Sequence, residues 1–264
     1  MYRACDGTGK GQTLDTSGTV ARTLAVLTVI AEAGGSVGVT DVAAALGLPM
    51  STSHRLLDLL RSGGFVERDA AQRRYRLGLK FLRVANLVTQ NASFAKLCQP
   101  ALERLTAETG ETALFCEYQP DRHMAAYAAI SDSTHSLRYR ITLFEPVPVE
   151  WGASGLAILS CLPSQVRAKV CAAPRPSPLT GKRLSSNALA AQIDTTRRKG
   201  FAFSNGDKLP ESIGIAVPVR LSEEQPIGSL TLTIPESRFV KSKLKSYVAL
   251  LSEEAQSLSA TKRK

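Results

Sequence analysis

Two short stretches between residues 40 and 62 constrain the fold more than any other part of the sequence. In the second stretch, residues 50–62, apolar or small residues recur every three or four positions, which predicts an amphipathic helix with one buried face. The residues of that face are Ser53, Leu56, Leu57 and Leu60. Gly47-Leu48-Pro49 precedes this helix and predicts a tight turn. The outer face carries Ser51, Thr52, His54, Arg55 and Asp58.

The first stretch predicts a shorter helix over residues 41–46, with Thr40 as its N-cap and Gly47 as its end. Its buried side is expected to hold Val42, Ala45 and Leu46. Two short helices joined by a glycine-containing turn, the second with a polar and basic outer face, are typical of a helix-turn-helix. In that motif the second helix enters the major groove of DNA. The helix over residues 50–62 is therefore the predicted recognition helix.

The surroundings of this pair predict a winged form of the motif. Residues 1–18 have no apolar periodicity and predict a flexible arm, and residues 19–33 predict a helix that ends at Gly34-Gly35. The buried face of that helix is expected to hold Val20, Leu24, Leu27 and Ala31. After Gly63-Gly64, residues 65–69 and 73–77 are typical of two strands joined by a tip at residues 70–72.

Positive charge concentrates in this hairpin. From Arg68 to Arg83 there are six basic residues and a single acidic one, Asp69, and the whole chain has a formal net charge of +10. Such a charge favours a polyanionic partner, although charge alone does not separate nucleic acid from a membrane surface. The residues expected to lie at double-stranded DNA are Ser51, Thr52, His54, Arg55, Arg73, Arg74 and Arg76. Two alternatives remain: the wing arginines form a solvated face, and Arg55 pairs with Asp58 or Glu67.

The rest of the chain predicts a second, larger domain. A linker helix over residues 79–93, with apolar residues on several sides, is expected to pack on several neighbours. An amphipathic helix over residues 94–110, interrupted by Pro100, is expected to bury Leu97, Ala101, Leu102 and Leu105. Strands are expected at 112–118, 123–130, 137–142, 214–221 and 228–234, and helices at 154–161, 164–171, 186–199 and 237–259. This order predicts an α+β domain over residues 94–260 with a largely antiparallel sheet.

Several classes of protein do not fit the sequence. No apolar run approaches the roughly 20 residues that span a bilayer, and the first residues do not resemble a secretory signal, so a cytoplasmic protein with no membrane partner is expected. The five cysteines and three histidines show no ligand spacing, so neither a metal site nor a cofactor is expected. The thiols are expected to be reduced and mostly structural.

Five segments resemble those of the isocitrate lyase regulator (IclR) family of bacterial transcription factors. Residues 47–57, GLPMSTSHRLL, resemble its recognition segment, and residues 74–78, RYRLG, resemble the end of its wing. Residues 152–159, GASGLAIL, resemble an Ala-x-Gly-Lys-Ala-x-Leu segment. Residues 199–202, KGFA, resemble Arg-Gly-Tyr-Ala, and residues 215–219, IAVPV, resemble Ile-Ala-Ala-Pro-Val. The segments occur in the family's order and cover nearly the whole chain.

The resemblance implies a winged helix-turn-helix over residues 19–78, joined by the linker helix to a GAF-like effector-binding domain. It also implies a dimer, or a dimer of dimers, on a partly palindromic operator, with a small organic or aromatic carboxylate as effector. By motif, the implied effector-binding residues are Tyr139, Val147, Trp151, Ala153, Ser154, Gly155, Ser204, Asp207 and Gly214. Trp151 fits a core or a dimer interface equally well. Leu156 stands where the family has a lysine, and Ser204 stands where some members have an acid.

Ser154 also suggests a catalytic alternative, because residues 152–155 loosely resemble a Gly-x-Ser-x-Gly elbow. However, Leu156 occupies the position of the second glycine, and no histidine follows Ser154 in the chain. A triad in the order of that fold therefore cannot be assembled from one subunit. The sequence predicts a ligand-responsive regulator rather than an enzyme. A third alternative is an architectural nucleic-acid-binding protein that has no ligand.

Overall fold

The computed structural model describes residues 18–69, 72–91 and 94–261. The chain divides into two units, Met1–Ala92 and Ser93–Lys264. Apart from Gly18, the arm expected over residues 1–18 lies outside the described residues, as do residues 70 and 71 of the wing tip.

The first unit begins with the helices α1 (Thr19–Glu32), α2 (Val39–Leu46) and α3 (Met50–Ser62). The predicted buried stripe of α3 is confirmed, since Ser53, Leu56, Leu57 and Leu60 are all buried. The turn before α3 includes Gly47, whose φ of 62° lies in the left-handed region that glycine adopts readily. The recognition-helix position predicted from the sequence is therefore the observed one.

Of the predicted buried face of α1, only Leu27 is correct, and it is half-buried against the core of this unit. Val26 and Ile30 are buried, whereas Val20 is 75% exposed, Leu24 is 56% exposed and Ala31 is also exposed. Apolar residues occur on more than one side of this helix, so periodicity alone does not select the side that packs.

The predicted N-cap and length of α2 are also wrong. Gly38 is the N-cap, and its backbone N–H donates to the Asp41 carboxylate at 2.8 Å. This bond extends the helix back to Val39, two residues before the expected start. Val42 is buried and Leu46 is half-buried, but Ala45 is exposed.

The wing is a two-stranded antiparallel hairpin of β1 (Val66–Asp69) and β2 (Arg74–Leu77), as predicted. Tyr75 is fully buried, and its backbone pairs with Val37 through bonds of 2.7 and 2.8 Å. The hairpin is thereby fixed to the loop before α2. Helix α4 (Leu79–Asn91) follows. Its expected packing is not observed, because Leu79, Leu82, Val84 and Leu87 are exposed; the side chain of Val88 lies outside the described residues.

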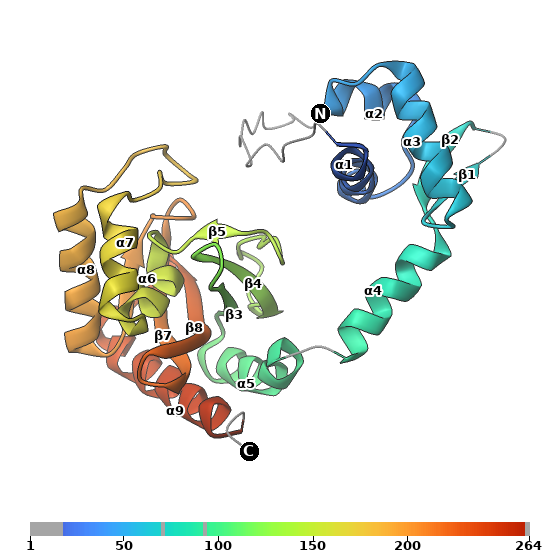
Figure 1. Ribbon diagram of the computed structural model, residues 1–264. Coiled ribbons are helices and arrows are strands. Elements are labelled where there is room, and N and C mark those ends of the chain that lie inside the picture. The colour runs from blue at the N-terminus through green and yellow to red at the C-terminus, as the bar shows by residue number, and fades with distance from the viewer. Residues whose placement is uncertain (1–17, 70–71, 92–93, 262–264) are drawn as a thin grey trace. The chain divides into compact units, whose positions relative to one another are not determined.

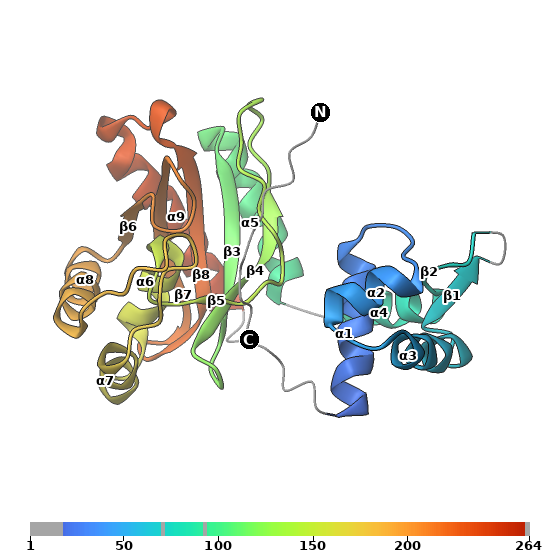
Figure 2. The ribbon, with the colours of Figure 1, turned by 90° about the horizontal axis from the view of Figure 1, so that it is seen from above.

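The second unit is built on a six-stranded antiparallel sheet of order β5-β4-β3-β8-β7-β6, which confirms the α+β prediction. Its strands are β3 (Thr112–Gln119), β4 (Met124–Ser131), β5 (Val147–Pro148), β6 (Ala202–Asn205), β7 (Ser212–Ser222) and β8 (Gln225–Pro235). Helices α5 (Phe94–Thr109) and α9 (Leu244–Thr261) cover one face, and α6 (Gly152–Cys161) covers the other, with α8 (Ser186–Lys199) packed on α6 (Figures 1 and 2). Helix α7 (Ser164–Ala172) lies beside α8.

Strand β8 separates two different interiors. Leu230, Leu232 and Ile234 belong to the core with α5 and α9. The alternate residues Ser229, Thr231 and Thr233 are also buried, and because side chains alternate along a strand they face α6. Ser229 Oγ donates to the Ser154 carbonyl oxygen at 3.1 Å, which fixes that orientation. One face of β8 is thus apolar and the other carries hydroxyl groups.

Some elements of this unit differ from those predicted. Residues 137–142 form no strand, and β5 and β6 were not expected as strands. Helix α5 continues through Pro100, and Leu97 is exposed rather than buried. The last helix starts at Leu244 rather than at residue 237, because the short 3-10 turns η1 (Glu236–Arg238) and η2 (Lys241–Lys243) precede it. The last residues of β8 are buried although no α-helix begins directly after the strand.

Candidate functional site

The outer face of α3 presents polar side chains to solvent. Ser51, His54 and Arg55 are exposed and Thr52 is half-buried. Asp58 holds two neighbours on this face: its carboxylate lies 2.9 Å from His54 Nδ1 and 3.3 Å from Arg61 Nε. No ion pair joins Arg55 to Asp58 or Glu67 among the described residues, so the structural alternative for Arg55 is not observed. Its guanidinium remains available to an outside partner.

The three wing arginines named in the sequence analysis have different surroundings. Arg74 donates to the Ser36 carbonyl oxygen at 2.6 Å and lies 3.3 Å from Asp41. Arg76 pairs with Glu67 at 3.0 Å and is largely exposed. Arg73 is exposed at the turn, with φ at 53°. Arg74 is therefore engaged in holding the wing against α2.

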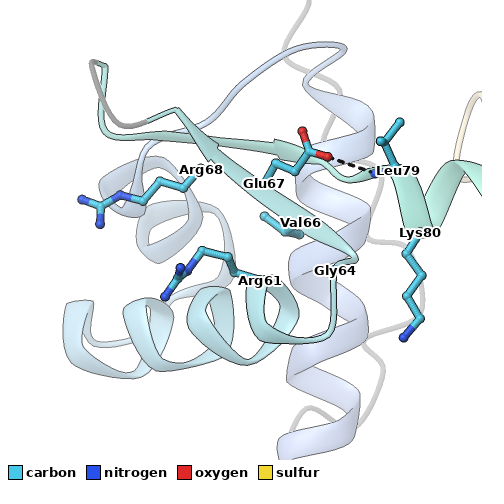
Figure 3. Close-up of a pocket in the computed structure, with 7 residues that line it drawn as sticks. All are labelled: Arg61, Gly64, Val66, Glu67, Arg68, Leu79 and Lys80. Carbon is cyan, nitrogen blue, oxygen red and sulfur yellow. Dashed lines mark hydrogen bonds between the residues drawn. The ribbon is translucent and has the colours of Figure 1, made fainter.

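A hollow between the end of α3, β1 and the start of α4 gathers further basic residues (Figure 3). Arg61 and Arg68 extend to the same side, and Lys80 points away from them. The Glu67 carboxylate accepts a bond of 3.2 Å from the Leu79 backbone N–H and so fixes the first turn of α4. Arg68 lies over the Tyr75 ring at 5.7 Å, and Lys80 lies over the Phe65 ring at 5.0 Å. Arg68 and Lys80 belong to the basic run from Arg68 to Arg83, but neither is among the residues expected at DNA from the sequence.

In the second unit, the start of α6 packs closely against the sheet. The Ala153 backbone N–H donates to Ser204 Oγ at 3.0 Å, although both residues belong to distant parts of the chain. A side chain on Gly214 would place its Cβ 2.6 Å from Ser204 Oγ, and one on Gly155 would lie 2.2 Å from the Val149 carbonyl oxygen. Four of the predicted effector residues, Ala153, Gly155, Ser204 and Gly214, thus lie together where only small residues fit.

Ser154 is the centre of a buried polar cluster. It is 1% exposed, and its Oγ lies 3.2 Å from the Tyr127 hydroxyl and 3.3 Å from Lys208 Nζ. Burial raises the pKa of the neighbouring Cys116 thiol, while the Lys208 charge and a hydrogen bond with Ser154 lower it. Tyr127, Lys208 and Cys116 were missed by sequence reasoning, because they come from β4, the loop after β6 and β3.

Thr231 adds an unsatisfied group to this face of the sheet. It lies two residues from Ser229 on β8 and is 2% exposed, and within the described part of the chain its hydroxyl has no hydrogen-bond partner. A buried hydroxyl without a partner is unfavourable by about 1–3 kcal/mol. The face under α6 therefore has hydrogen-bonding capacity that the chain itself does not use.

The remaining residues implied as effector-binding have different surroundings. Val147 is half-buried on the short edge strand β5. Trp151 is 8% exposed, and its indole N–H donates to the Arg175 carbonyl oxygen at 2.9 Å, beside the buried Glu150–Arg175 ion pair. Tyr139 donates from its hydroxyl to the Glu211 carbonyl oxygen at 2.6 Å. Asp207 is half-buried, and its pKa is raised by burial and partly lowered again by Lys208.

Tyr139 connects two irregular segments at this site. Its hydroxyl also lies 3.0 Å from the Pro210 carbonyl oxygen, so it bonds twice to the loop that carries Lys208. Glu211 in that loop has φ at 53°, a left-handed conformation rare outside glycine. This strained residue is followed directly by β7, which starts at Ser212.

The helix-turn-helix, the basic wing and the separate polar cluster define a DNA-binding transcriptional regulator. The model of the IclR helix-turn-helix domain matches residues 19–70, and the model of the C-terminal domain of bacterial transcriptional regulator IclR matches residues 86–260. The chain belongs to the IclR family. Within the described residues, no helix is both long and apolar enough to cross a bilayer.

Individual proteins of the family are similar to this chain over most of their length. The chain is 25% identical to the transcriptional repressor IclR of Escherichia coli over 236 residues, which cover 89% of this chain and 86% of the repressor. The structure of Thermotoga maritima IclR is similar with a TM-score of 0.77 at 20% identity, covering 93% of this chain and 99% of that one. An IclR homologue from Microbacterium hydrocarbonoxydans, solved with 4-hydroxybenzoate, has a TM-score of 0.75 at 24% identity, covering 92% and 98%.

Proposed function

We propose that this chain controls transcription by binding an operator with its winged helix, and that a small organic or aromatic carboxylate bound beneath α6 changes the operator affinity. The observation that carries this proposal is the buried polar cluster at Ser154, with the unsatisfied Thr231 hydroxyl on the same sheet face. The homologue solved with 4-hydroxybenzoate supports an aromatic acid as one member of the ligand class.

On the DNA side, α3 supplies groove contacts through Ser51, Thr52, His54 and Arg55, and the wing supplies phosphate contacts. Arg68 and Arg73 are the phosphate contacts best supported by the structure, because neither forms an ion pair among the described residues. Arg74 and Arg76 act mainly within the unit, through Ser36, Asp41 and Glu67. One recognition helix buries little surface, so we propose that a dimer, or a dimer of dimers, binds two half-sites.

Mobility-shift assays with the intergenic DNA upstream of the gene test the DNA-binding half. We expect a specific complex whose affinity falls steeply with salt, with a slope that decreases by about 0.9 for each phosphate contact removed. Arg68→Ala and Arg73→Ala should each reduce that slope, whereas Lys169→Ala on α7 is the matched control and should not. A complex with no sequence preference would instead favour an architectural protein.

The sensing half is tested by thermal unfolding in the presence of benzoate, 4-hydroxybenzoate, pyruvate and succinate. A ligand that binds only the folded protein raises the midpoint by several degrees at saturation. The same acid should change operator affinity. Ser154→Trp places an indole beside Tyr127 and Lys208, where the effector is proposed to bind, and should abolish the shift. The absence of any shift in the wild type would contradict the sensing half while leaving DNA binding intact.

A further inference from the structure

Lys208 lies across the start of α6. Its Nζ is 3.3 Å from Ser154 Oγ and 5.5 Å from the centre of the Tyr127 ring. Its aliphatic chain packs on Gly152, where an added Cβ would lie 3.0 Å from the Lys208 Cδ. Gly152 has φ at 72°, so this position favours glycine in both its conformation and its space. The fold thus shapes the start of α6 to admit a lysine side chain.

The ammonium group has only neutral direct contacts. Within the described residues, no carboxylate forms an ion pair with Lys208, and the adjacent Asp207 acts on it only through the charge interaction described above. Helix α6 itself has the sequence GASGLAILSC and carries no charged residue. A half-buried cation whose partners are a hydroxyl and an aromatic face gains further stabilisation from an anion.

The groups around Lys208 match a carboxylate more closely than a neutral ligand. The first turn of α6 carries the positive end of the helix dipole, with the Ala153 N–H already bonded to Ser204. The Thr231 hydroxyl, buried and without a partner among the described residues, is a donor on the sheet face beneath. The Lys208 ammonium group lies at the start of α6, and the Thr231 hydroxyl lies on the sheet face that the same helix covers. A charged donor at this helix start favours an acceptor that bears negative charge.

We propose that Lys208 is the residue that makes this site select an anion, by pairing its ammonium group directly with the effector carboxylate. This inference rests on the proposed function, because it names the charge partner within the same effector site. The loop after β6 supplies the positive charge that α6, with Leu156 at its fifth position, does not supply. Tyr139 holds that loop through its bonds to Pro210 and Glu211. Selection by charge then depends on the loop and not on the helix.

The test compares an acid with its neutral amide by calorimetric titration of the full-length protein. Whichever of 4-hydroxybenzoate, benzoate, pyruvate and succinate binds the wild type is titrated together with its amide. Lys208→Met keeps the apolar stem and removes the charge, Lys208→Arg keeps the charge, and Lys169→Met is the matched surface control. We expect the acid to bind Lys208→Met at least about tenfold more weakly, since a hydrogen bond to a charged group contributes about 1.5–3 kcal/mol. The amide should bind Lys208→Met and the wild type equally.

Each outcome decides the inference. Loss of acid affinity alone, with much of it retained in Lys208→Arg and all of it in Lys169→Met, supports it. An acid that binds Lys208→Met as tightly as the wild type overturns the inference and leaves the proposed function standing. Equal loss of acid and amide also overturns it, because the lysine would then act through packing. If none of the four acids binds the wild type, both the sensing function and the inference fail.

Discussion

The guanidinium of Arg74 donates to the carbonyl oxygen of Ser36 at 2.6 Å, across 38 residues of sequence. Its Nε also lies 3.1 Å from the Ser36 hydroxyl, and the terminal nitrogen that donates to the carbonyl oxygen, Nη2, also contacts Asp41. The neighbouring Tyr75 backbone pairs with Val37 in the same place. The wing is therefore anchored to the loop that leads into α2. Arg74, which the sequence predicted as a DNA contact, forms this anchor.

Arg74→Ala is expected to lower the free energy of unfolding by about 1–3 kcal/mol, because a charged donor is removed from a partly buried carbonyl oxygen. Urea unfolding followed by circular dichroism measures this change. Arg73→Ala, at the exposed turn, should change stability by less than about 0.5 kcal/mol. If Arg74→Ala were as stable as the wild type and bound operator more weakly, the anchoring role would be wrong.

Asp58→Asn is expected to strengthen binding to duplex DNA of any sequence. Asp58 places a negative charge on the outer face of α3, 2.9 Å from His54 Nδ1, and forms an ion pair with Arg61. Removing one charge close to the phosphates changes affinity by about fivefold, which corresponds to about 1 kcal/mol. Fluorescence anisotropy with a random duplex at low salt measures the effect. Asp194→Asn on α8 is the control, and an equal gain there would show that only net charge matters.

Gly155→Ala is expected to destabilise the second unit by about 2 kcal/mol or more, because its Cβ would lie 2.2 Å from the Val149 carbonyl oxygen. Scanning calorimetry of the full chain should show a lower midpoint for that unit. Gly35→Ala meets no atom within 4 Å and serves as the control. A Gly155→Ala protein with wild-type stability would show that α6 is able to move away from the residues before it.

Stability is expected to fall as pH rises from 10 to 12, partly through Tyr118. Burial raises the Tyr118 pKa from 10.0 to about 12, and the charge of Arg175 opposes the rise. In that interval the unfolded chain releases the phenolic proton while the folded chain retains it, so unfolding becomes more favourable with pH. Tyr118→Phe should flatten the dependence of the unfolding free energy on pH over this interval.

The bond of 2.8 Å between the Tyr118 hydroxyl and His123 Nδ1 is also lost in Tyr118→Phe. That loss lowers the free energy of unfolding by a similar amount at each pH below 10. The change of this free energy with pH, and not its absolute value, therefore tests the role of Tyr118. A variant with the same slope as the wild type from pH 10 to 12 would assign the alkaline transition to other groups.

The recognition helix was predictable because its buried residues are apolar or small at one clear period, whereas its neighbours required tertiary information. In α1 apolar residues lie on several sides, and only contact with the rest of the unit selects Val26 and Ile30. The start of α2 depends on Asp41 reaching back to Gly38, a bond that outweighs the preference for Thr40 as a cap. Propensity is a weak guide where one such bond decides.

For the candidate effector site, the sequence predicted the residues that local motifs carry, and it missed those that only the pairing of distant strands and loops brings together. Ala153, Ser154 and Gly155 are adjacent in sequence, and the structure brings them to Ser204 and Gly214. Lys208 and Tyr127 reach Ser154 only because β4 and the loop after β6 meet the same helix. A lysine directly after Gly206-Asp207 was the one local signal, and it resembles any solvated loop cation. Thr231 is notable only because its buried hydroxyl has no hydrogen-bond partner in the part of the chain that the structure describes.

Residues on one face of β8 are able to change independently of those on the other face. Leu230, Leu232 and Ile234 hold the helices on one side, so a change there alters the fold as a whole. Ser229, Thr231 and Thr233 are interleaved with them yet face the other interior. Exchanging one of these small hydroxyl residues for another changes the chemistry presented under α6 while the apolar side of the strand stays intact. Related sequences are thereby able to change which ligand groups this face of the sheet binds without first losing the stability of the fold.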